Sequence, residues 1–128
     1  ATSKNYKADK ILEDTTAEAL KGFDTKVFQN VRLETIDGGV TEVDVLALIQ
    51  IGIGKVPMVV SSKNYANKVP LSVIKKDIKK IRRVKLLRNV PHIKLLVVSK
   101  IDEPARQIAE YNGFDVVEVG FQVTEENM

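Results

Sequence analysis

Two neighbouring stretches decide how this chain folds: residues 41–48, TEVDVLAL, and residues 59–65, VVSSKNY. Both are rich in valine or in alternating apolar residues, which favours strands. Because side chains alternate between the two faces of a strand, the residues of the first stretch divide into two sets. One face is predicted to carry Glu42, Asp44, Leu46 and Leu48, and the other face Val43, Val45, Ala47 and Ile49.

An acid stands inside the first predicted strand, and a lysine follows the second. Asp44 lies in an apolar run, where a carboxylate is costly unless it has a partner. Ser61 and Lys63 share a face of the second strand by the same alternation. If the two strands pair, Asp44 is predicted to approach Ser61 and Lys63. Such a pocket suits phosphodiester hydrolysis, because a carboxylate holds Mg²⁺ and a lysine stabilises the transition state.

The first half of the chain predicts a helix followed by an antiparallel meander of three strands. Gly22 ends the helix, and the run Asp37-Gly38-Gly39 marks the first hairpin. A turn over residues 52–57 marks the second hairpin. The predicted bounds are residues 7–21 for the helix and residues 25–36, 40–51 and 58–62 for the three strands.

The second half of the chain predicts two helices and two strands. Apolar residues at spacings of three and four predict a helix from Leu71 to Ile81. Residues 92–99, HIKLLVVS, are predicted to form a strand buried on both faces of a mixed sheet, because residues 93–98 are apolar apart from Lys94. A helix over residues 103–112 and a strand over residues 114–119 follow. The predicted fold class is α/β, a mixed sheet in the order α-β-β-β-α-β-α-β.

The net charge is only +3, but the charges are unevenly distributed. Residues 75–88 hold eight bases and one acid, whereas residues 101–128 hold seven acids and one base. A basic flank on a nearly neutral chain is typical of a phosphate-binding surface. The predicted nucleic-acid-binding residues are Lys75, Lys76, Lys79, Lys80, Arg82 and Arg83. The alternative is a solvated helix face without a ligand.

Composition narrows the class of protein. With 128 residues, 44% of them hydrophobic and 29% charged, residues 1–128 are predicted to form a single globular domain. The absence of cysteine excludes disulfides, zinc–thiolate sites and thiol nucleophiles. We see neither an apolar run long enough to span a membrane nor a signal peptide, which predicts a cytoplasmic protein. Abundant lysine, isoleucine and valine favour a thermophile.

The order of these elements and motifs resembles the PD-(D/E)XK superfamily of restriction-endonuclease-like nucleases. The resemblance extends from about residue 10 to residue 119 and includes the family core α-β-β-β-α-β. Asp44 matches the acid of the family's first motif strand, and Ser61-Ser62-Lys63 is similar to the acid-x-lysine triplet of the next. Glu13 matches a helical glutamate that is a frequent further ligand in the family.

The resemblance implies a Mg²⁺-dependent endonuclease, active with Mn²⁺ as well, that acts on DNA. It implies Asp44, Glu13 and the backbone carbonyl of Ser62 as metal ligands. It also implies that Asp44, Glu13 and Lys63 are the catalytic residues, with Lys63 in the role of the family's lysine. Since small domains of this fold often act in pairs, a homodimer is a further expectation.

One residue departs from the family pattern, because Ser61 stands where the family carries Glu or Asp. A serine hydroxyl is neutral and a poor Mg²⁺ ligand, so weak metal binding is expected. Three replacements are open. Glu42 could supply the missing carboxylate, or Asp77 on the following helix could do so. Alternatively, Glu13, Asp44 and the Ser62 carbonyl suffice for one weakly bound ion.

Two functions remain open on the sequence: a Mg²⁺-dependent endonuclease, or a catalytically inactive nuclease-fold module with a structural or regulatory binding role. Other motifs carry no chemistry of their own. The run Gly52-Ile53-Gly54-Lys55 lacks the glycine spacing of a phosphate loop and reads as a hairpin turn. His92 is the only histidine, so neither a zinc cluster nor a histidine-based triad is predicted.

Overall fold

The computed structural model describes residues 3–22 and 24–127, and its elements follow the predicted order. Helix α1 (Ser3–Leu20) comes first and begins earlier than the predicted residue 7. Three consecutive strands follow, β1 (Thr25–Glu34), β2 (Val40–Ile51) and β3 (Gly54–Lys63). Neighbours among these strands pair antiparallel, so the predicted meander is confirmed.

The second half adds the parallel part of the sheet. Helix α2 (Leu71–Arg82) and the 3-10 turn η1 (Lys85–Leu87) lead to β4 (Ile93–Val98), which runs parallel to β3. Helix α3 (Glu103–Tyr111) leads to β5 (Phe114–Glu118), which runs parallel to β4. Parallel neighbours require a crossover, and the two helices provide it. The strand order β1-β2-β3-β4-β5 is the predicted mixed sheet.

Strand β3 begins at Gly54 rather than at the predicted residue 58. Gly52 and Ile53 alone form the turn, since Ile51 already pairs with Gly54 and Gly52 has a φ of +61°. A glycine at the first position of a two-residue hairpin supplies this positive φ. The prediction left Pro57 outside the strand, but pairing with β4 starts only at Met58, so β3 is still a sheet edge at Pro57 and tolerates proline there.

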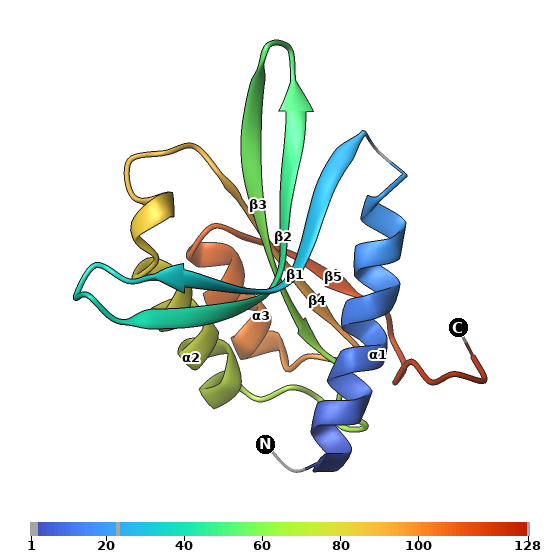
Figure 1. Cartoon of the computed structure of the whole chain (residues 1–128). Helices are drawn as coiled ribbons and strands as arrows, with labels where there is room; N and C mark the ends of the chain where they lie inside the picture. The colour runs from blue at the N-terminus through green and yellow to red at the C-terminus, as the bar shows by residue number, and fades with distance from the viewer. Residues whose placement is uncertain (1–2, 23, 128) are drawn as a thin grey trace.

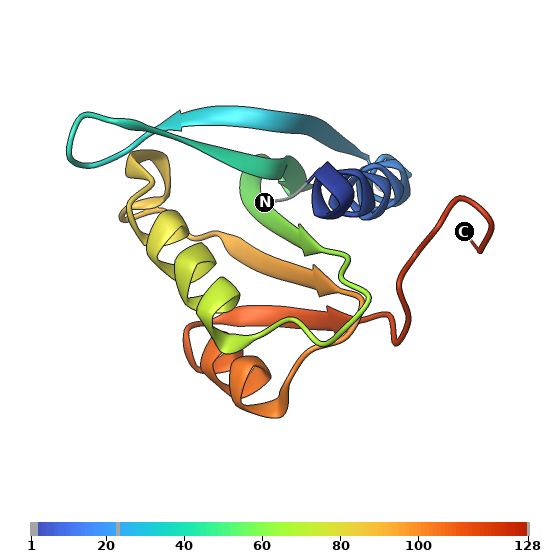
Figure 2. The ribbon, with the colours of Figure 1, turned by 90° about the horizontal axis from the view of Figure 1, so that it is seen from below.

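Helices cover both faces of the sheet (Figures 1 and 2). Helix α1 packs on one face, where Leu12 and Ala17 meet apolar side chains of β2, β3 and β4. Helices α2 and α3 pack on the other face around a larger core. Adjacent residues Val59 and Val60 belong to different cores, as expected in a strand buried on both sides. Within the described residues, no helix combines the length and the apolar character that a membrane span needs.

Strands β1 and β2 bend half-way along, at Asn30 and Asp44. The ladder pairs Gln29 with Val45 and then Val31 with Val43, and it skips the pair between them. Asn30 has a φ of +54°, a left-handed conformation that asparagine adopts more readily than most residues. Beyond the bend the hairpin crosses over toward α2 and η1 (Figure 1). We call this part, residues 31–43, the bent arm.

The bend changes the face that β2 presents to each core. Val45 packs in the core under α1, whereas Val43 packs with Leu46 in the core under α2 and α3. The prediction that Val43 and Val45 share a face is therefore wrong, because strict alternation fails where the backbone leaves the regular β conformation. The arm is held in its new position by the N–H of Ile36, which donates to the carbonyl of Arg83 at 2.8 Å.

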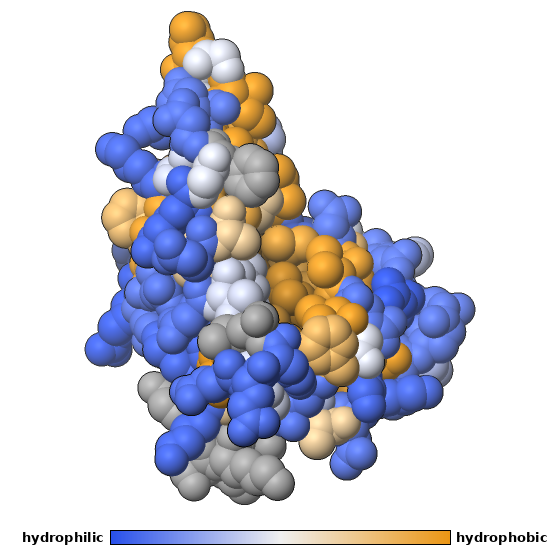
Figure 3. Space-filling view, turned by 90° about the vertical axis from the view of Figure 1, so that its right-hand side faces the viewer, coloured by the Kyte–Doolittle hydropathy of each residue, from blue (hydrophilic) through white to orange (hydrophobic). Residues whose placement is uncertain are grey.

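An apolar surface remains exposed beside α1 (Figure 3). It forms a groove between α1, the two parallel strands β4 and β5, and the segment that follows β5. Its members include Leu20, Leu95, Val117, Val119 and Phe121. Contiguous exposed apolar surfaces often mark interaction sites. We refer to this region as the apolar groove.

Candidate active site

Asp44 lies at the bend of β2, where β2 leaves β3. The regular pairing of these strands reaches Val45 opposite Val60 and ends there. Beyond it the Asp44 carboxylate turns toward the end of β3, and its Oδ2 accepts a hydrogen bond from the backbone N–H of Ser62 at 3.0 Å. The pairing of the two strands thus brings Asp44 to the Ser61-Ser62-Lys63 segment.

Lys63, the last residue of β3, forms an ion pair with Asp77 of α2. Its Nζ lies 3.8 Å from Oδ1 of Asp77, and the two side chains are only 19% and 8% exposed. Burial lowers the pKa of Lys63, but the attraction of Asp77, Asp44 and Asp9 outweighs burial and raises this pKa above its ordinary value. Lys63 is therefore a cation at neutral pH.

Asp77 is an acid on the buried face of an otherwise basic helix. It is 6% exposed and lies beside the core residue Ile78. Burial raises the pKa of Asp77, and the attraction of Lys63 and Lys80 offsets only part of that rise. Its Oδ2 is buried without a hydrogen-bond partner in the described part of the chain. A bare buried carboxylate oxygen is costly, and a cation would relieve that cost.

Helix α1 adds two more acids, Asp9 and Glu13, which lie one turn apart. Oδ1 of Asp9 accepts a hydrogen bond from the backbone N–H of Asn64 at 2.7 Å, directly after Lys63. Burial raises the pKa of Asp9, against the opposing effects of the Asn64 N–H and Lys63. Sequence reasoning missed Asp9, although its spacing of four residues from Glu13 is the signal that places both on one helix face.

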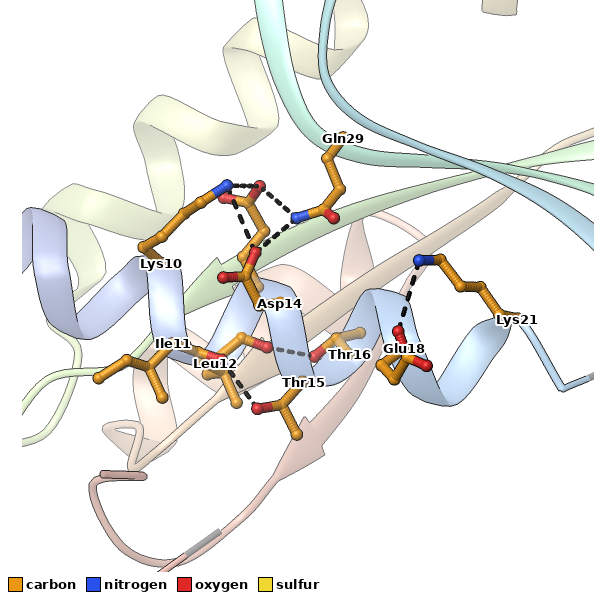
Figure 4. Close-up of polar contacts among 10 residues, drawn as sticks. Lys10, Ile11, Leu12, Asp14, Thr15, Thr16, Glu18, Lys21 and Gln29 are labelled. Carbon is orange, nitrogen blue, oxygen red and sulfur yellow. Dashed lines mark hydrogen bonds and ion pairs between the residues drawn. The ribbon is translucent and has the colours of Figure 1, made fainter. Parts of the chain in front are cut away.

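A polar network joins Lys10 and Asp14 of α1 to Gln29 of β1 (Figure 4), and Glu13 belongs to the same network. Nε2 of Gln29 donates to Oε1 of Glu13 at 3.2 Å and to Asp14 at 2.7 Å. Lys10 lies 3.5 Å from the same Glu13 oxygen. Burial raises the pKa of Glu13, and the nearby charge of Asp44 raises it further. Glu13 is thus within electrostatic range of Asp44, but Gln29 and Lys10 already engage part of its carboxylate.

Ser61 and Ser62 bring hydroxyls to the site, and both are buried. Ser61 lies close enough to Asp77 for its hydroxyl to lower the pKa of that carboxyl slightly, while burial keeps the pKa raised. The Oγ of Ser62 is buried and has no hydrogen-bond partner among the described residues. At position 61 there is thus a hydroxyl where the family resemblance would place an acid, and the Asp77 carboxylate of α2 lies beside that hydroxyl.

Asn64 fastens the end of β3 to two other parts of the molecule. Its side chain is fully buried, and its Nδ2 donates to the carbonyls of Ala8 at 2.7 Å and Val123 at 2.8 Å. Its Oδ1 accepts a hydrogen bond from the N–H of Val123 at 2.8 Å. Because its backbone N–H also holds Asp9, this residue positions both an acid of α1 and the adjoining Lys63.

Three acids, Asp9, Asp44 and Asp77, therefore converge on Lys63 from α1, β2 and α2, and Glu13 lies within electrostatic range of Asp44. We call Asp9, Glu13, Asp44 and Asp77, together with Lys63, the acidic cluster. Within residues 3–22 and 24–127, no three acidic or histidine side chains form a ready-made metal site. Mg²⁺ needs fewer protein ligands, because it keeps several waters and binds through one or two carboxylates and substrate phosphates. The oxygen-only donors and the bare oxygen of Asp77 fit Mg²⁺ better than zinc.

A hollow of about 250 Å³ separates α2 from the bent arm. We call it the basic hollow, because it is lined by Lys76, Lys79, Lys80 and Arg83 together with Thr35 and Thr41. It adjoins the acidic cluster, since Lys80 attracts the Asp77 carboxylate and lowers its pKa against the larger effect of burial. Arg83 also pairs with Asp37 near the tip of the arm, which helps to hold the arm over α2.

The six basic residues predicted to bind nucleic acid do not share one side of α2. Four of them line the basic hollow, and Lys75 is exposed outside it. Arg82 points to the opposite side of the helix, where its Nη2 donates to Oδ1 of Asn112. An α-helix turns by about 100° per residue, so a continuous basic run covers more than one side.

Two solved structures share this fold. The protein of unknown function AF1548 matches with a TM-score of 0.69 and 16% sequence identity over 90% of this chain. EndoMS in its apo form, an endonuclease, matches with a TM-score of 0.51 and 13% identity over 86% of this chain. The present chain spans 59% of the AF1548 chain and 45% of the EndoMS chain. No family model matches the chain, and no curated protein matches its sequence.

The fold of this chain is similar to the folds of AF1548 and EndoMS. At such low sequence identity the two structural similarities are evidence for the fold alone, because one fold can host several functions. What the molecule does is therefore argued from the acidic cluster and the basic hollow of this chain.

Proposed function

We propose that this protein is a Mg²⁺-dependent endonuclease of the PD-(D/E)XK type that acts on DNA. One observation carries the proposal: Asp44, Lys63 and Asp77 meet where β2 parts from β3. A carboxylate and a buried lysine side by side are the groups that phosphodiester hydrolysis uses. The structural likeness to an endonuclease supports the same function.

The proposed metal ligands are Asp44, the backbone carbonyl of Ser62, and either Glu13 or Asp77. When bound, Mg²⁺ or Mn²⁺ neutralises charge on the phosphate and lowers the pKa of the attacking water. The N–H of Ser62 orients Asp44, and Asp77 presents a bare oxygen. Because Gln29 and Lys10 already occupy part of Glu13, we expect Asp77 to bind the ion more strongly than Glu13 does.

Asp77 takes the place of the acid that is missing at Ser61. The other acid considered for this role, Glu42, is exposed in the bent arm opposite Arg32. Asp77 instead lies buried beside Lys63, close to Ser61. Its carboxyl must lose a proton to bind a metal ion, and burial raises its pKa, so metal binding is expected to weaken at acidic pH.

Lys63 is proposed to stabilise negative charge rather than to accept a proton. Although burial alone would lower its pKa, the surrounding acids raise it, so the ammonium group stays protonated at neutral pH. A permanently charged ammonium group cannot act as a general base. It can donate hydrogen bonds to the phosphate oxygens on which charge develops in the transition state.

The basic hollow is the proposed contact for the DNA backbone. Four cations and two threonine hydroxyls lie together beside the acidic cluster. Such groups bind phosphate oxygens and fix the position of a duplex without reading its sequence. Affinity from these contacts should be salt-dependent and largely independent of sequence.

We further propose a homodimer that forms through the apolar groove. A two-fold interface requires a surface that complements itself, and an apolar surface does so without charge pairing. The groove runs beside β5, an edge strand of the sheet. Sedimentation analysis is expected to find dimers of the unmodified protein and monomers of the Phe121→Asp variant. A monomeric unmodified protein at every concentration would refute this proposal.

The alternative is a catalytically inactive nuclease-fold module with a structural or regulatory binding role. Two observations favour it. Glu13 is partly engaged by Gln29 and Lys10, and the described residues hold no ready-made group of three metal-binding side chains. Such a module would still bind DNA through the basic hollow.

A cleavage assay separates the two functions. Plasmid and branched DNA are incubated with Mg²⁺ or Mn²⁺ and the unmodified protein, the Asp44→Ala variant, or an Asp115→Ala control on the exposed side of β5. We expect metal-dependent cleavage by the unmodified protein and the control, and none by Asp44→Ala or in EDTA. DNA binding without any cleavage under either metal would favour the inactive module.

A further inference from the structure

A second cavity, of about 270 Å³, lies on the side of α2 that faces away from the basic hollow. It is bounded by α2, η1 and the first residues of β4 and β5. Its floor is apolar and buried, since Ile81, Val84, Leu87 and Phe114 are each 5% exposed or less. Its polar lining includes Arg82, Arg88, His92, Lys94 and Asn112. We call this cavity the cationic pocket.

No carboxylate compensates the charge of the cationic pocket, although Nζ of Lys94 lies over the Phe114 ring, 5.4 Å from its centroid. In the described part of the chain, the lining includes no acid, and no carboxylate forms an ion pair with Arg82, Arg88 or Lys94. Other partly buried cations of this protein, such as Lys63 and Arg106, do have such partners. Like charges gathered over apolar walls focus the electrostatic potential and raise the local concentration of anions.

Two of these cations are held in place before any ligand arrives. Oδ1 of Asn112 accepts a hydrogen bond from Arg82, and its backbone carbonyl accepts one from Nζ of Lys94 at 2.7 Å. Gly113 leaves room for Lys94, because a Cβ at that position would come within 3.2 Å of Nζ. An ammonium has three donors and a guanidinium five, so both groups retain donors for a ligand.

His92 completes the polar lining of the pocket. Its Nδ1 lies 2.8 Å from the carbonyl oxygen of Val90. A carbonyl oxygen only accepts hydrogen bonds, so Nδ1 carries the proton and Nε2 is the second polar atom of the ring. The imidazole ring also adds a planar surface to the apolar floor, and planar surfaces stack well with bases.

We propose that the cationic pocket binds the phosphate monoester of a nucleotide. The cations recognise the phosphate through charge-assisted hydrogen bonds, and the apolar floor accepts the planar base. Two sources share this chemistry: a free mononucleotide and the 5′-phosphorylated end of a DNA strand. Lys94 lies at the start of β4, roughly 13 Å along the strand from Val98, which pairs with Lys63. The pocket is therefore separate from the acidic cluster and needs no cleavage activity.

Calorimetric titration in EDTA tests this proposal with three probes: inorganic phosphate, deoxyadenosine monophosphate and deoxyadenosine. We expect the monophosphate to bind at least about tenfold more tightly than either of the other probes, because only it engages both the cations and the floor. Equal affinity for the monophosphate and inorganic phosphate would overturn the proposal of a nucleotide site. No binding of the monophosphate would do so as well.

Three variants locate the binding. Arg88→Gln, on the exposed rim, and Lys94→Gln are each expected to weaken monophosphate binding about tenfold, the usual loss for one hydrogen bond to a charged group. Lys79→Gln in the basic hollow removes the same charge elsewhere and is the matched control. An equal loss in the control would show general attraction of anions and would overturn the proposal.

Oligonucleotides distinguish the two sources of the nucleotide. Fluorescence anisotropy in EDTA compares a 5′-phosphorylated strand with the same strand carrying a 5′-hydroxyl. A preference of about tenfold for the phosphorylated strand that Arg88→Gln removes would identify the strand end. Equal binding of both strands, with monophosphate binding intact, would identify the free mononucleotide. Because no metal is present, a negative cleavage assay leaves this result unaffected.

Discussion

The two ends of the parallel pair β3 and β4 handle charge in opposite ways. At the end of these strands, the Lys63 cation of the acidic cluster is buried among acids and forms an ion pair with Asp77. At the start of β4, the cations of the cationic pocket have no carboxylate partner in the described residues. Buried charges need partners, whereas charges at a rim can remain unpaired until a ligand arrives. This difference is the basis for proposing the first end as a reacting site and the second as a binding site.

The largest expected effect tests whether the acidic end is the reacting one. Lys63→Met should reduce metal-dependent DNA cleavage by about 100- to 1,000-fold, because it removes one charged donor from the transition state. DNA binding should change little, since the basic hollow stays intact. Lys55→Met, in the exposed β2–β3 hairpin, is the matched control and should cleave normally. Normal cleavage by Lys63→Met would contradict the proposal that the acidic cluster is the reacting site.

The next effect concerns Asp77, the acid proposed to replace the one missing at position 61. Asp77→Ser should reduce cleavage and Mn²⁺ affinity by about 100-fold. The double exchange Asp77→Ser with Ser61→Asp should recover at least about a tenth of the original activity, because it returns a carboxylate to the neighbourhood of Lys63. Single-turnover cleavage and calorimetry measure both quantities. An exchange no better than Asp77→Ser alone would contradict the proposed substitution of one acid for the other.

A smaller effect tests whether DNA contacts the basic hollow or is attracted by positive charge anywhere on the protein. Replacing Lys76 and Lys79 with glutamine should reduce the slope of log affinity against log salt by roughly 2, since each lysine is assigned one phosphate. Replacing the exposed Lys26 and Lys68 instead keeps the net charge equal and should leave the slope unchanged. Anisotropy titrations of duplex DNA at several salt concentrations provide the measurement. Equal slopes for the two double variants would count against the hollow as the DNA contact.

The smallest effect is a pH dependence of stability without metal. Burial raises the native-state pKa of Asp77, Asp9 and Glu13 above the unfolded value of about 4. Between the unfolded pKa and the raised native pKa of each group, the native state therefore binds more protons than the unfolded state. In this pH range these groups make the free energy of unfolding fall as pH rises. Asp77→Asn should flatten this decline in urea unfolding measured in EDTA, while Asp115→Asn should not. If the unfolding free energy of Asp77→Asn depends on pH as steeply as that of the unmodified protein, the claim that the Asp77 carboxylate is buried without full compensation is wrong.

Most of the fold could be predicted because its signals are local. The spacing of Leu71, Ile74 and Ile78 marks α2, and the turn at Gly38 and Gly39 marks the first hairpin. The bend at Asn30 could not be predicted, because it depends on the distant contact between Ile36 and Arg83 that holds the bent arm over α2. The alternation of β2 therefore holds on each side of the bend but not across it.

The candidate site divides in the same way. The proximity of Asp44 and Lys63 can be predicted from the sequence, because the two residues lie on consecutive strands joined by a short hairpin. Asp77 reads in the sequence as one acid in a basic run, and only the packing of α2 shows that it turns inward to Lys63. The place of Asp9 in the site depends likewise on how α1 packs against the end of β3. Asn64, 55 positions further along the chain, holds Asp9 there through a backbone hydrogen bond.

The bend at Asn30 also determines where this molecule tolerates a change in length. Residues added at the exposed tip, near Gly38 and Gly39, extend the arm and leave the base of the hairpin as it is. A single residue inserted into β2 between Asp44 and the hairpin to β3 would instead shift the register of β2 against β3 and carry that carboxylate to the wrong face. Evolution can therefore adjust the reach of the arm at one end while the chemistry stays anchored at the other.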